Sequence, residues 1–384
     1  MITEMSFPTR IVFGKGALRE VPNNLARLAV KRPLLVTDAG VAQAGLLGRL
    51  KSVLDASKVA HAVFEYADPG PRVSTVERGV AAYREAGCDG IVAIGGGSPI
   101  DVGKGVRLLA AHPPPLAQYD DARDGWRLVT NPMPPMMAVP TTAGSGSEAG
   151  RSFVVSLEEA GRRAVVFASQ LMPSVAVCDP ELTYDLPPRL TATTGMDALA
   201  HAVEALCAKG FHPLADALAV KGIALCAGHL VRAVRNGRDE EARAQMMVAS
   251  IAGAAAAQKG LGVAHSIAHA LGCIAGVHHG LAEAVVLPFA MEFNLMAAAP
   301  CLAEAAIAMG EMPSDDTDRL ARRAVERVRS MARDAGVPQR LREVGVKESQ
   351  LKQLTDEAFE DASHLANPRP CGPADLSALL HAAY

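Results

Sequence analysis

Neither sign of charge dominates this chain of 384 residues, which carries 38 basic and 41 acidic side chains. A strongly basic surface for nucleic acid or for an anionic membrane is therefore not expected. Long apolar runs are also missing: the segment 246–257 is short and rich in alanine, which favours a buried core helix over a membrane span. The N-terminal residues MITEMSFPTRIVFGKG lack a basic segment followed by an apolar run, so we expect no secretory signal.

The cysteines show no pattern of a disulfide framework or of a metal-binding CxxC motif. There are seven of them, an odd number, scattered from Cys88 to Cys371. This distribution is typical of reduced, mostly buried thiols in a cytoplasmic protein, with a structural disulfide as the alternative. The length suits two or three domains with an ample buried core.

Short β-rich runs alternate with helical stretches in the first half of the chain. This rhythm predicts a parallel sheet with crossover helices. The β-rich runs lie at 33–38, 59–66 and 90–97, and the helical stretches follow them at 40–54, at 73–87 and up to about 110. Further apolar β-like runs lie at 136–140, 153–157, 164–169 and 175–179.

The character of the sequence changes near DLPPRLTA, residues 185–192. Beyond this point helical periodicity dominates and β signals nearly vanish. We therefore predict an α/β domain over residues 1–185 and an all-helical domain over residues 186–384.

A glycine-rich loop follows the apolar strand within GIVAIGGGSPIDVGKG, residues 90–105. Gly95, Gly96 and Gly97 let the backbone approach a ligand closely, and Ser98 opens a helical pattern. Free N–H groups at the start of that helix attract a phosphate group. The loop is neither GxGxxG nor a P-loop, and an ordinary tight strand–helix turn is the alternative interpretation.

Two further features suit a bound dinucleotide. In MAVPTTAGSGSEAG, residues 137–150, small hydroxyl residues follow an apolar strand, among them Thr141, Thr142 and Ser145. A flexible surface loop is the alternative. Asp38 closes the strand PLLVTD, where a carboxylate can accept hydrogen bonds from a ribose 2′-hydroxyl and repels a 2′-phosphate; a helix cap is the alternative.

Carboxylate and imidazole side chains recur at helical spacing in the second half. Asp197 and His201 are four residues apart, as are His265 and His269, so each pair shares one helix face. His279 follows, but the HxxxH pair lacks the glutamate of the HExxH zinc-protease motif. Asp197, His201 and two histidines from 265–279 could bind a divalent metal, and spacing alone leaves open which two; an ion pair of Asp197 with His201 is the alternative.

Taken together, the motifs resemble those of the iron-containing (group III) alcohol dehydrogenase family. They occur in the family order along almost the whole chain: GGGSPIDVGK, PTTAGSGSE, LPPRLTATTGMDALAHAVEA, HSIAHALG, HHGLAEAVVLP and NPRP. The resemblance implies a Rossmann-like, NAD-binding α/β domain and an all-helical metal-binding domain, as in dehydroquinate synthase. It also implies an NAD-linked alcohol dehydrogenase or aldehyde reductase, active as a homodimer.

The resemblance also assigns roles to residues of this chain. The family's metal ligands fall on Asp197, His201, His265 and His279, and its proton-relaying histidine falls on His269. The loop GGGS is expected to bind the pyrophosphate, Thr141, Thr142 and Ser145 to line the cofactor cleft, and Asp38 to favour NAD over NADP. The resemblance implies Fe²⁺ as the metal, and Zn²⁺ is the alternative, because three histidines and one aspartate suit either ion and raw affinity favours zinc.

One departure bears on the substrate, a small alcohol or aldehyde. Arg151 stands where many members carry a smaller or neutral residue that faces the substrate. A guanidinium there can bind a carboxylate, which predicts a hydroxy-acid and semialdehyde pair; a solvent-facing or ion-paired arginine is the alternative. Three other interpretations of the chain remain: a metal-free enzyme resembling maleylacetate reductase, a lyase resembling dehydroquinate synthase, and a catalytically inactive interaction protein.

Overall fold

The computed structural model describes residues 9–68 and 70–384, which divide into two compact units. Within the described residues, an α/β unit contains the chain up to Thr142 together with Ser147–Thr183. A helical unit contains Ala143–Gly146 and Tyr184–Tyr384. The predicted fold class, a parallel α/β sheet followed by helices, is thereby confirmed.

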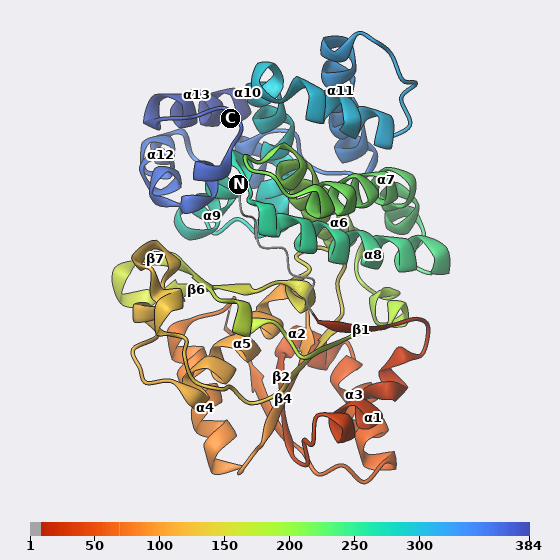
Figure 1. Ribbon diagram of the computed structural model, residues 1–384, viewed down its shortest axis with the longest axis vertical. Coiled ribbons are helices and arrows are strands. Elements are labelled where there is room, and N and C mark those ends of the chain that lie inside the picture. Colours follow the sequence, from red (N-terminus) through yellow and green to blue (C-terminus); the bar gives the residue numbers. More distant parts are fainter. Residues whose placement is uncertain (1–8, 69) are drawn as a thin grey trace. The chain divides into compact units, whose positions relative to one another are not determined.

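Six parallel strands form the central sheet of the α/β unit (Figure 1). The sequence predicts five of them but not the first strand, whose apolar run is only three residues long. In sheet order the strands are β1 (Arg10–Phe13), β8 (Val175–Cys178), β5 (Met136–Pro140), β4 (Gly90–Gly95), β2 (Pro33–Asp38) and β3 (Ala62–Tyr66).

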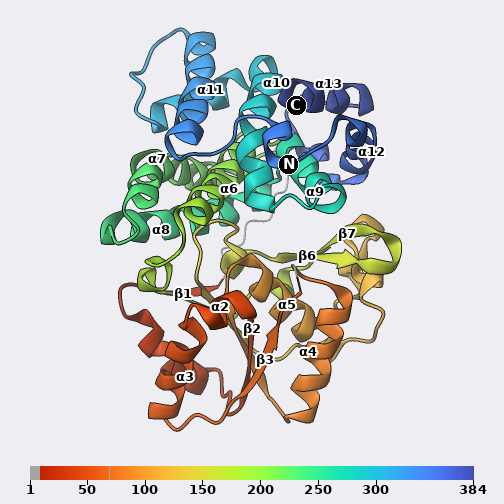
Figure 2. The same cartoon turned by 180° about the vertical axis from the view of Figure 1, so that it is seen from behind.

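Helices cover both faces of this sheet (Figures 1 and 2). On one face, α1 (Val21–Arg27) and α3 (Leu46–Ala56) pack on the alternate strand residues that include Leu35 and Val92. On the other face, α4 (Val73–Glu85) and α5 (Gly97–Ala111) pack on the intervening residues that include Leu34 and Ile91. The helix predicted over 40–54 is divided into α2 (Ala39–Gln43) and α3, because Gly45 between them has a left-handed φ of 78°.

The strand order places a topological switch between β2 and β4. From β2 the chain moves outward to β3, then returns to pair β4 with the other side of β2 and continues to β5. At such a switch the connections leave in opposite directions, and a crevice opens at the carboxyl ends of the two strands. Those ends are Asp38 and the glycine loop that starts at Gly95.

Two of the apolar runs in the first half form a separate antiparallel pair and do not join the parallel sheet. They are β6 (Ser152–Leu157) and β7 (Arg162–Phe167). Their side chains alternate between buried and half-buried, so one face of the pair packs on the unit and the other is partly solvated.

The helical unit is built around α6, whose residues from Thr191 to Cys207 are buried with one exception, His201. Helices α7, α8 and α10 pack on it. Its helices are α6 (Pro188–Cys207), α7 (Pro213–Arg235), α8 (Glu240–Ala256), α9 (Val263–Ile274), α10 (His279–Ala308), α11 (Thr317–Asp334), α12 (Leu351–Glu360) and α13 (Pro373–Ala383).

Two of these helices, α7 and α10, are long and apolar enough to cross a membrane when length and composition alone are considered. In the described structure, 39% and 56% of their most apolar stretches are buried within the protein. The segment 246–257, which the sequence assigned to a core helix, ends α8, and Met246 and Met247 are both buried there.

Candidate metal centre and cofactor-binding loops

Three helices of the helical unit bring the predicted metal ligands together. Helix α6 carries Asp197 and His201, α9 carries His265, and α10 begins at His279. Oxygen and nitrogen atoms of Asp197, His265 and His279 all lie within 4.8 Å of one another. Asp197 therefore shares a site with histidines that follow it by 68 and 82 residues.

Distances among these side chains bring His201 into the same cluster. Asp197 Oδ1 lies 3.2 Å from His201 Nδ1 and 3.7 Å from His279 Nε2. The Nε2 atoms of His201 and His265 are 3.3 Å apart. Within the described residues, the buried atoms Asp197 Oδ1 and His279 Nδ1 have no hydrogen-bond partner.

The contact between His201 and His265 requires a cation. Nδ1 of His201 donates to the main-chain oxygen of Asp197 at 2.9 Å, and Nδ1 of His265 donates to Glu204 Oε2 at 2.6 Å. In the neutral rings both Nε2 atoms therefore carry lone pairs, and these lone pairs face each other. A shared proton or a bound metal ion removes this repulsion, so the donor set fits a divalent metal.

The pKa shifts follow from burial and from the charge of Asp197. Burial lowers the pKa of His201, but the charge of Asp197 and the hydrogen bond to its main-chain oxygen outweigh burial and raise the pKa above its ordinary value. Burial lowers the pKa of His265 and lowers that of His279 strongly. Burial would raise the pKa of Asp197, but His201, His279 and His265 hold it well below its usual range.

Glu204 positions His265 and was not identified from the sequence. Its buried carboxylate accepts hydrogen bonds from the main-chain N–H groups of Gly262 (3.0 Å) and Ala264 (2.7 Å), at the start of α9. It therefore caps the helix and fixes the tautomer of His265 at the same time. Its spacing, three residues after His201 and seven after Asp197, places it on their helix face and was the available signal.

A close approach of α6 and α10 depends on Gly280. A Cβ atom at this position would lie 2.6 Å from the main-chain oxygen of Thr193 and 3.4 Å from Asp197 Cβ. Only glycine allows the start of α10 to come so near α6. The residue next to it, His279, is thereby brought beside Asp197.

His269 also has a carboxylate partner, Asp361, which the sequence did not reveal. Nδ1 of His269 donates to Asp361 Oδ2 at 2.7 Å, and Asp361 Oδ1 accepts from Ser266 Oγ and from the N–H of Ser363. Burial would raise the pKa of Asp361, but the charge and hydrogen bond of His269, together with Ser363, lower it. The ring of His269 stacks on that of His279 with centroids 5.1 Å apart. Asp361 lies 92 residues from His269, so no local pattern could connect them.

The glycine loop of the α/β unit has the geometry of a close-approach turn. Gly95 has a φ of 152°, and a Cβ atom there would lie 2.4 Å from the Pro99 side chain. Gly96 lies against Thr142, and α5 begins at Gly97 without a side-chain cap, followed by Ser98. The N–H of Thr141 donates to Gly95 at 2.9 Å and ties the two loops together. The first turn of α5 can therefore donate its free N–H groups to a phosphate.

Asp38 caps a helix at the switch point. Its Oδ1 accepts a hydrogen bond of 2.8 Å from the N–H of Val41, in the first turn of α2. The sequence allowed this helix-cap role as the alternative to ribose binding, and the cap uses a single carboxylate oxygen. The other oxygen can still accept a hydrogen bond from a ribose hydroxyl.

A buried polar network behind the glycine loop was also missed. The ammonium group of Lys104 donates to Ser147 Oγ and to the main-chain oxygens of Gly150 and Ser152, and Ser147 donates to Asp101. Burial lowers the pKa of Lys104 to about 8 and raises the pKa of Asp101. The network fixes helix α5 to the start of β6. The motif SPIDVGK contains both Asp101 and Lys104, but only the fold shows that they are buried.

Two of the predicted site residues, Ser145 and Arg151, belong neither to the metal cluster nor to the glycine loop. Ser145 belongs to the helical unit, whereas Thr141 and Thr142 belong to the α/β unit. Arg151 precedes β6 and is half-buried, with its guanidinium group over the ring of Phe167 at 4.8 Å from the centroid. This cation–π contact holds the guanidinium in place.

Family models describe nearly the whole chain. The model of iron-containing alcohol dehydrogenase matches residues 8–180, and that of the C-terminal part of the Fe-containing alcohol dehydrogenase family matches residues 191–384. The 4-hydroxybutyrate dehydrogenase of Cupriavidus necator is 40% identical over 97% of this chain and 97% of its own.

Solved structures share the fold along the whole chain. A 1,3-propanediol oxidoreductase superimposes with a TM-score of 0.95 at 36% identity, with all of both chains covered. The sulfoacetaldehyde reductase of Bifidobacterium kashiwanohense, solved in complex with NAD⁺, superimposes with a TM-score of 0.86 at 29% identity, over 100% of this chain and 99% of that one.

Replacement of a ligand is expected to remove the metal. We predict that His265→Ala loses tightly bound metal, because it deletes a donor at the centre of the cluster, whereas His278→Ala retains it because the exposed His278 lies outside the cluster. Metal affinity should also weaken as the pH falls through neutrality, since the raised pKa of His201 lets protons compete with the ion. Metal analysis of anaerobically purified protein, at pH values above and below neutrality, checks both results. Stoichiometric metal in His265→Ala would show that the ion is bound elsewhere.

Proposed function

Because the chain belongs to the iron-containing alcohol dehydrogenase family and is an NAD-dependent oxidoreductase, we propose that it interconverts a small hydroxy acid and the matching semialdehyde. The observation that carries this proposal is Arg151, a half-buried guanidinium held over Phe167 directly after the cofactor loop. The 40% identical relative named for 4-hydroxybutyrate supports it. The acid would be bound through its carboxylate.

We propose Asp197, His201, His265 and His279 as the ligands of the metal, with Fe²⁺ first and Zn²⁺ as the alternative. The two facing Nε2 atoms and the hydrogen-bond-free Asp197 Oδ1 support this set. A divalent metal bound there polarises an alcohol or carbonyl oxygen and lowers the pKa of an alcohol. Glu204 keeps His265 in the tautomer whose Nε2 can bind the ion.

His269 is proposed to carry the proton. Oxidation of the alcohol moves a hydride from its carbinol carbon to the nicotinamide, and the hydroxyl proton leaves separately. With Nδ1 donating to Asp361, Nε2 of His269 has a lone pair that can accept that proton. The side chain of His269 is 12% exposed, so a proton can pass from it to solvent.

The cofactor is proposed to bind along the α/β unit at its topological switch. Gly95, Gly96, Gly97 and Ser98 would bind the pyrophosphate at the start of α5, and Thr141 and Thr142 would line the cleft; Ser145 follows them in the chain and is proposed as a further cofactor-binding residue. Asp38 would accept a hydrogen bond from the ribose. We further propose a cytoplasmic homodimer without nucleic-acid or membrane partners, in keeping with the balanced charge of the chain.

The proton path can be separated from metal binding. His269→Ala should keep its metal and lose turnover by about 10²- to 10⁴-fold, the usual contribution of general acid–base catalysis. Asp361→Asn should also lower turnover and keep the metal, because a neutral amide accepts a weaker hydrogen bond from Nδ1 than a carboxylate does and orients the imidazole less firmly. Metal content and pH–rate profiles of both variants are the measurements, and metal loss in His269→Ala would mean that ligand and relay had been exchanged.

The substrate proposal predicts a preference for anions that depends on Arg151. In the wild type, kcat/KM for 4-hydroxybutyrate should exceed that for butanol and 1,3-propanediol, and Arg151→Leu should reduce it by about 10- to 100-fold, as for one charge-assisted pair. Arg151→Lys should lose less, and Arg123→Leu, which removes an exposed arginine of the same unit, should lose nothing. Faster turnover of the neutral alcohols in the wild type would contradict an anionic substrate.

Cofactor choice is expected to depend on the charge of Asp38. Asp38→Asn keeps a side-chain oxygen for the cap on Val41 but removes the charge that repels a 2′-phosphate. The ratio of kcat/KM for NAD to that for NADP should therefore fall in this variant, and Asp38→Gly should lower it as well. Equal efficiency with both cofactors in the wild type would refute the role of Asp38.

A further inference from the structure

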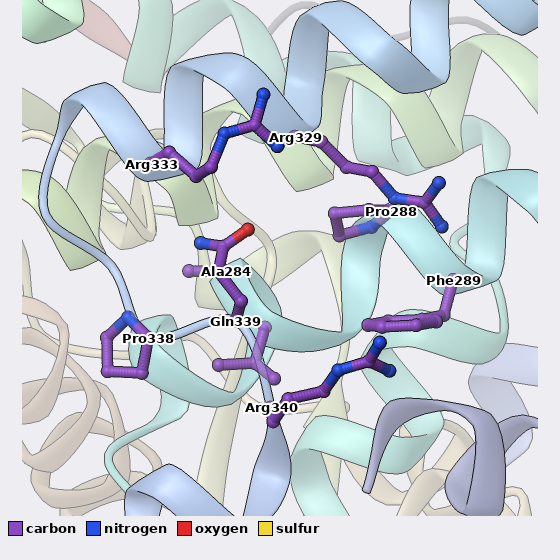
Figure 3. A pocket seen from close by; sticks show the side chains of 9 residues that line it. Ala284, Pro288, Phe289, Arg329, Arg333, Pro338, Gln339 and Arg340 are labelled. Atoms are coloured by element: carbon purple, nitrogen blue, oxygen red, sulfur yellow. The ribbon is translucent and has the colours of Figure 1, made fainter.

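A cavity of about 340 Å³ lies in the helical unit, between α10, α11 and the segment that follows α11 (Figure 3). None of the proposed metal, cofactor or substrate residues lines it. Its walls combine an apolar floor with arginine side chains. The lining residues are Ala284, Val285, Pro288, Phe289, Arg329, Arg333, Pro338, Gln339 and Arg340.

Positive charge is concentrated in this cavity. Arg329 and Arg333 are one helical turn apart on α11, and Arg340 comes from the segment beyond it. The lining residues include no carboxylate. Arg329 forms an ion pair with Glu292, which is not a lining residue, whereas the side chain of Arg333 makes no ion pair or hydrogen bond within the part of the chain that the structure describes.

Two of the guanidinium groups are held in place before any ligand binds. Arg329 and Arg340 both lie over the ring of Phe289, at 5.5 Å and 5.3 Å from its centroid. Figure 3 shows both groups converging on this ring. Arg340 also donates to the main-chain oxygen of Ala382. Such fixed guanidinium groups lose little conformational entropy when an anion binds.

We propose that this cavity is a binding site for a small phosphomonoester. Its volume falls within the range of small-molecule sites. Guanidinium groups bind phosphate bidentately, and Arg333 and Arg340, neither of which pairs with a carboxylate within the described residues, suit a dianion. The floor of Ala284, Val285, Pro288 and Phe289 would contact the carbon part of the ester. The cavity shares no lining residue with the site proposed for the hydroxy acid, so this proposal does not depend on the identity of the substrate.

Calorimetric titration of the metal-loaded enzyme in saturating NAD tests this site, because NAD then occupies the pyrophosphate-binding loop. We expect glycerol 1-phosphate and inorganic phosphate to bind with a stoichiometry of one per chain, and succinate to bind at least tenfold more weakly. Arg333→Gln should weaken phosphate binding at least tenfold without affecting the fold, since this side chain has no partner to lose. Arg322→Gln, an exposed arginine two turns from Arg329 on the same helix, should change it less than twofold.

Three results would overturn the proposal. The first is the absence of phosphate binding to the wild type at millimolar concentration. The second is equal affinity in Arg333→Gln and in Arg333→Gln/Arg340→Gln, which would place the anion elsewhere. The third is dissociation of an oligomer by the double variant in sedimentation, without phosphate binding to the wild type, which would assign the cavity to an acidic segment of a second copy.

Discussion

The repulsion between two imidazole nitrogens at 3.3 Å is the constraint on which the rest of the candidate site depends. His201 and His265 both have Nδ1 engaged by an oxygen, so their Nε2 atoms face each other with lone pairs unless a cation lies between them. In the protein without metal a proton can fill this role, which agrees with the raised pKa of His201 and the lowered pKa of His265. A divalent ion in this position would take the place of that proton, with Asp197 as the proposed charged ligand. A cation between the two Nε2 atoms, either a proton or a metal ion, therefore stabilises the cluster.

The helical fold maintains this strained arrangement through a few contacts. Glu204 joins α6 to the start of α9, so the helix end and the orientation of His265 have a common origin. Gly280 allows α10 to begin against α6. Asp361 orients the neighbouring His269, which is a proposed relay and not a ligand. Each contact involves a buried charge or a missing Cβ, and each has a specific partner on another helix.

The sequence predicts what depends on local order and on motif spacing. The strands β2, β4 and β5, the glycine loop and the change to helices near residue 185 all follow from apolar patterns and turn residues. Same-face spacing relates Asp197 to His201 and His265 to His269, and the family resemblance selects His279 over His278. In the structure His279 lies beside Asp197, whereas His278 is exposed, and the assignment of His279 as a ligand stays a prediction.

Other features could not be predicted, because they arise from pairings far apart in the sequence. The pairs of Glu204 with His265 and of Asp361 with His269 span 61 and 92 residues. In the sequence, the apolar runs that form β6 and β7 cannot be distinguished from strands of the parallel sheet, because a strand pattern does not reveal which strand it pairs with. A helix cap at Asp38 is a local feature that the sequence allows. Only the structure shows that the cap uses one of the two carboxylate oxygens.

Anomalous scattering from crystals of the enzyme loaded with Fe²⁺ or Zn²⁺ would locate the metal. We expect one ion per chain, at about 2.0–2.3 Å from one nitrogen each of His201, His265 and His279 and from a carboxylate oxygen of Asp197. The buried group of Glu204, His265 and Glu283 also brings ligand atoms within 4.8 Å of one another. An ion bound to that group, with His201 and His279 uncoordinated, would rule out the proposed ligand set.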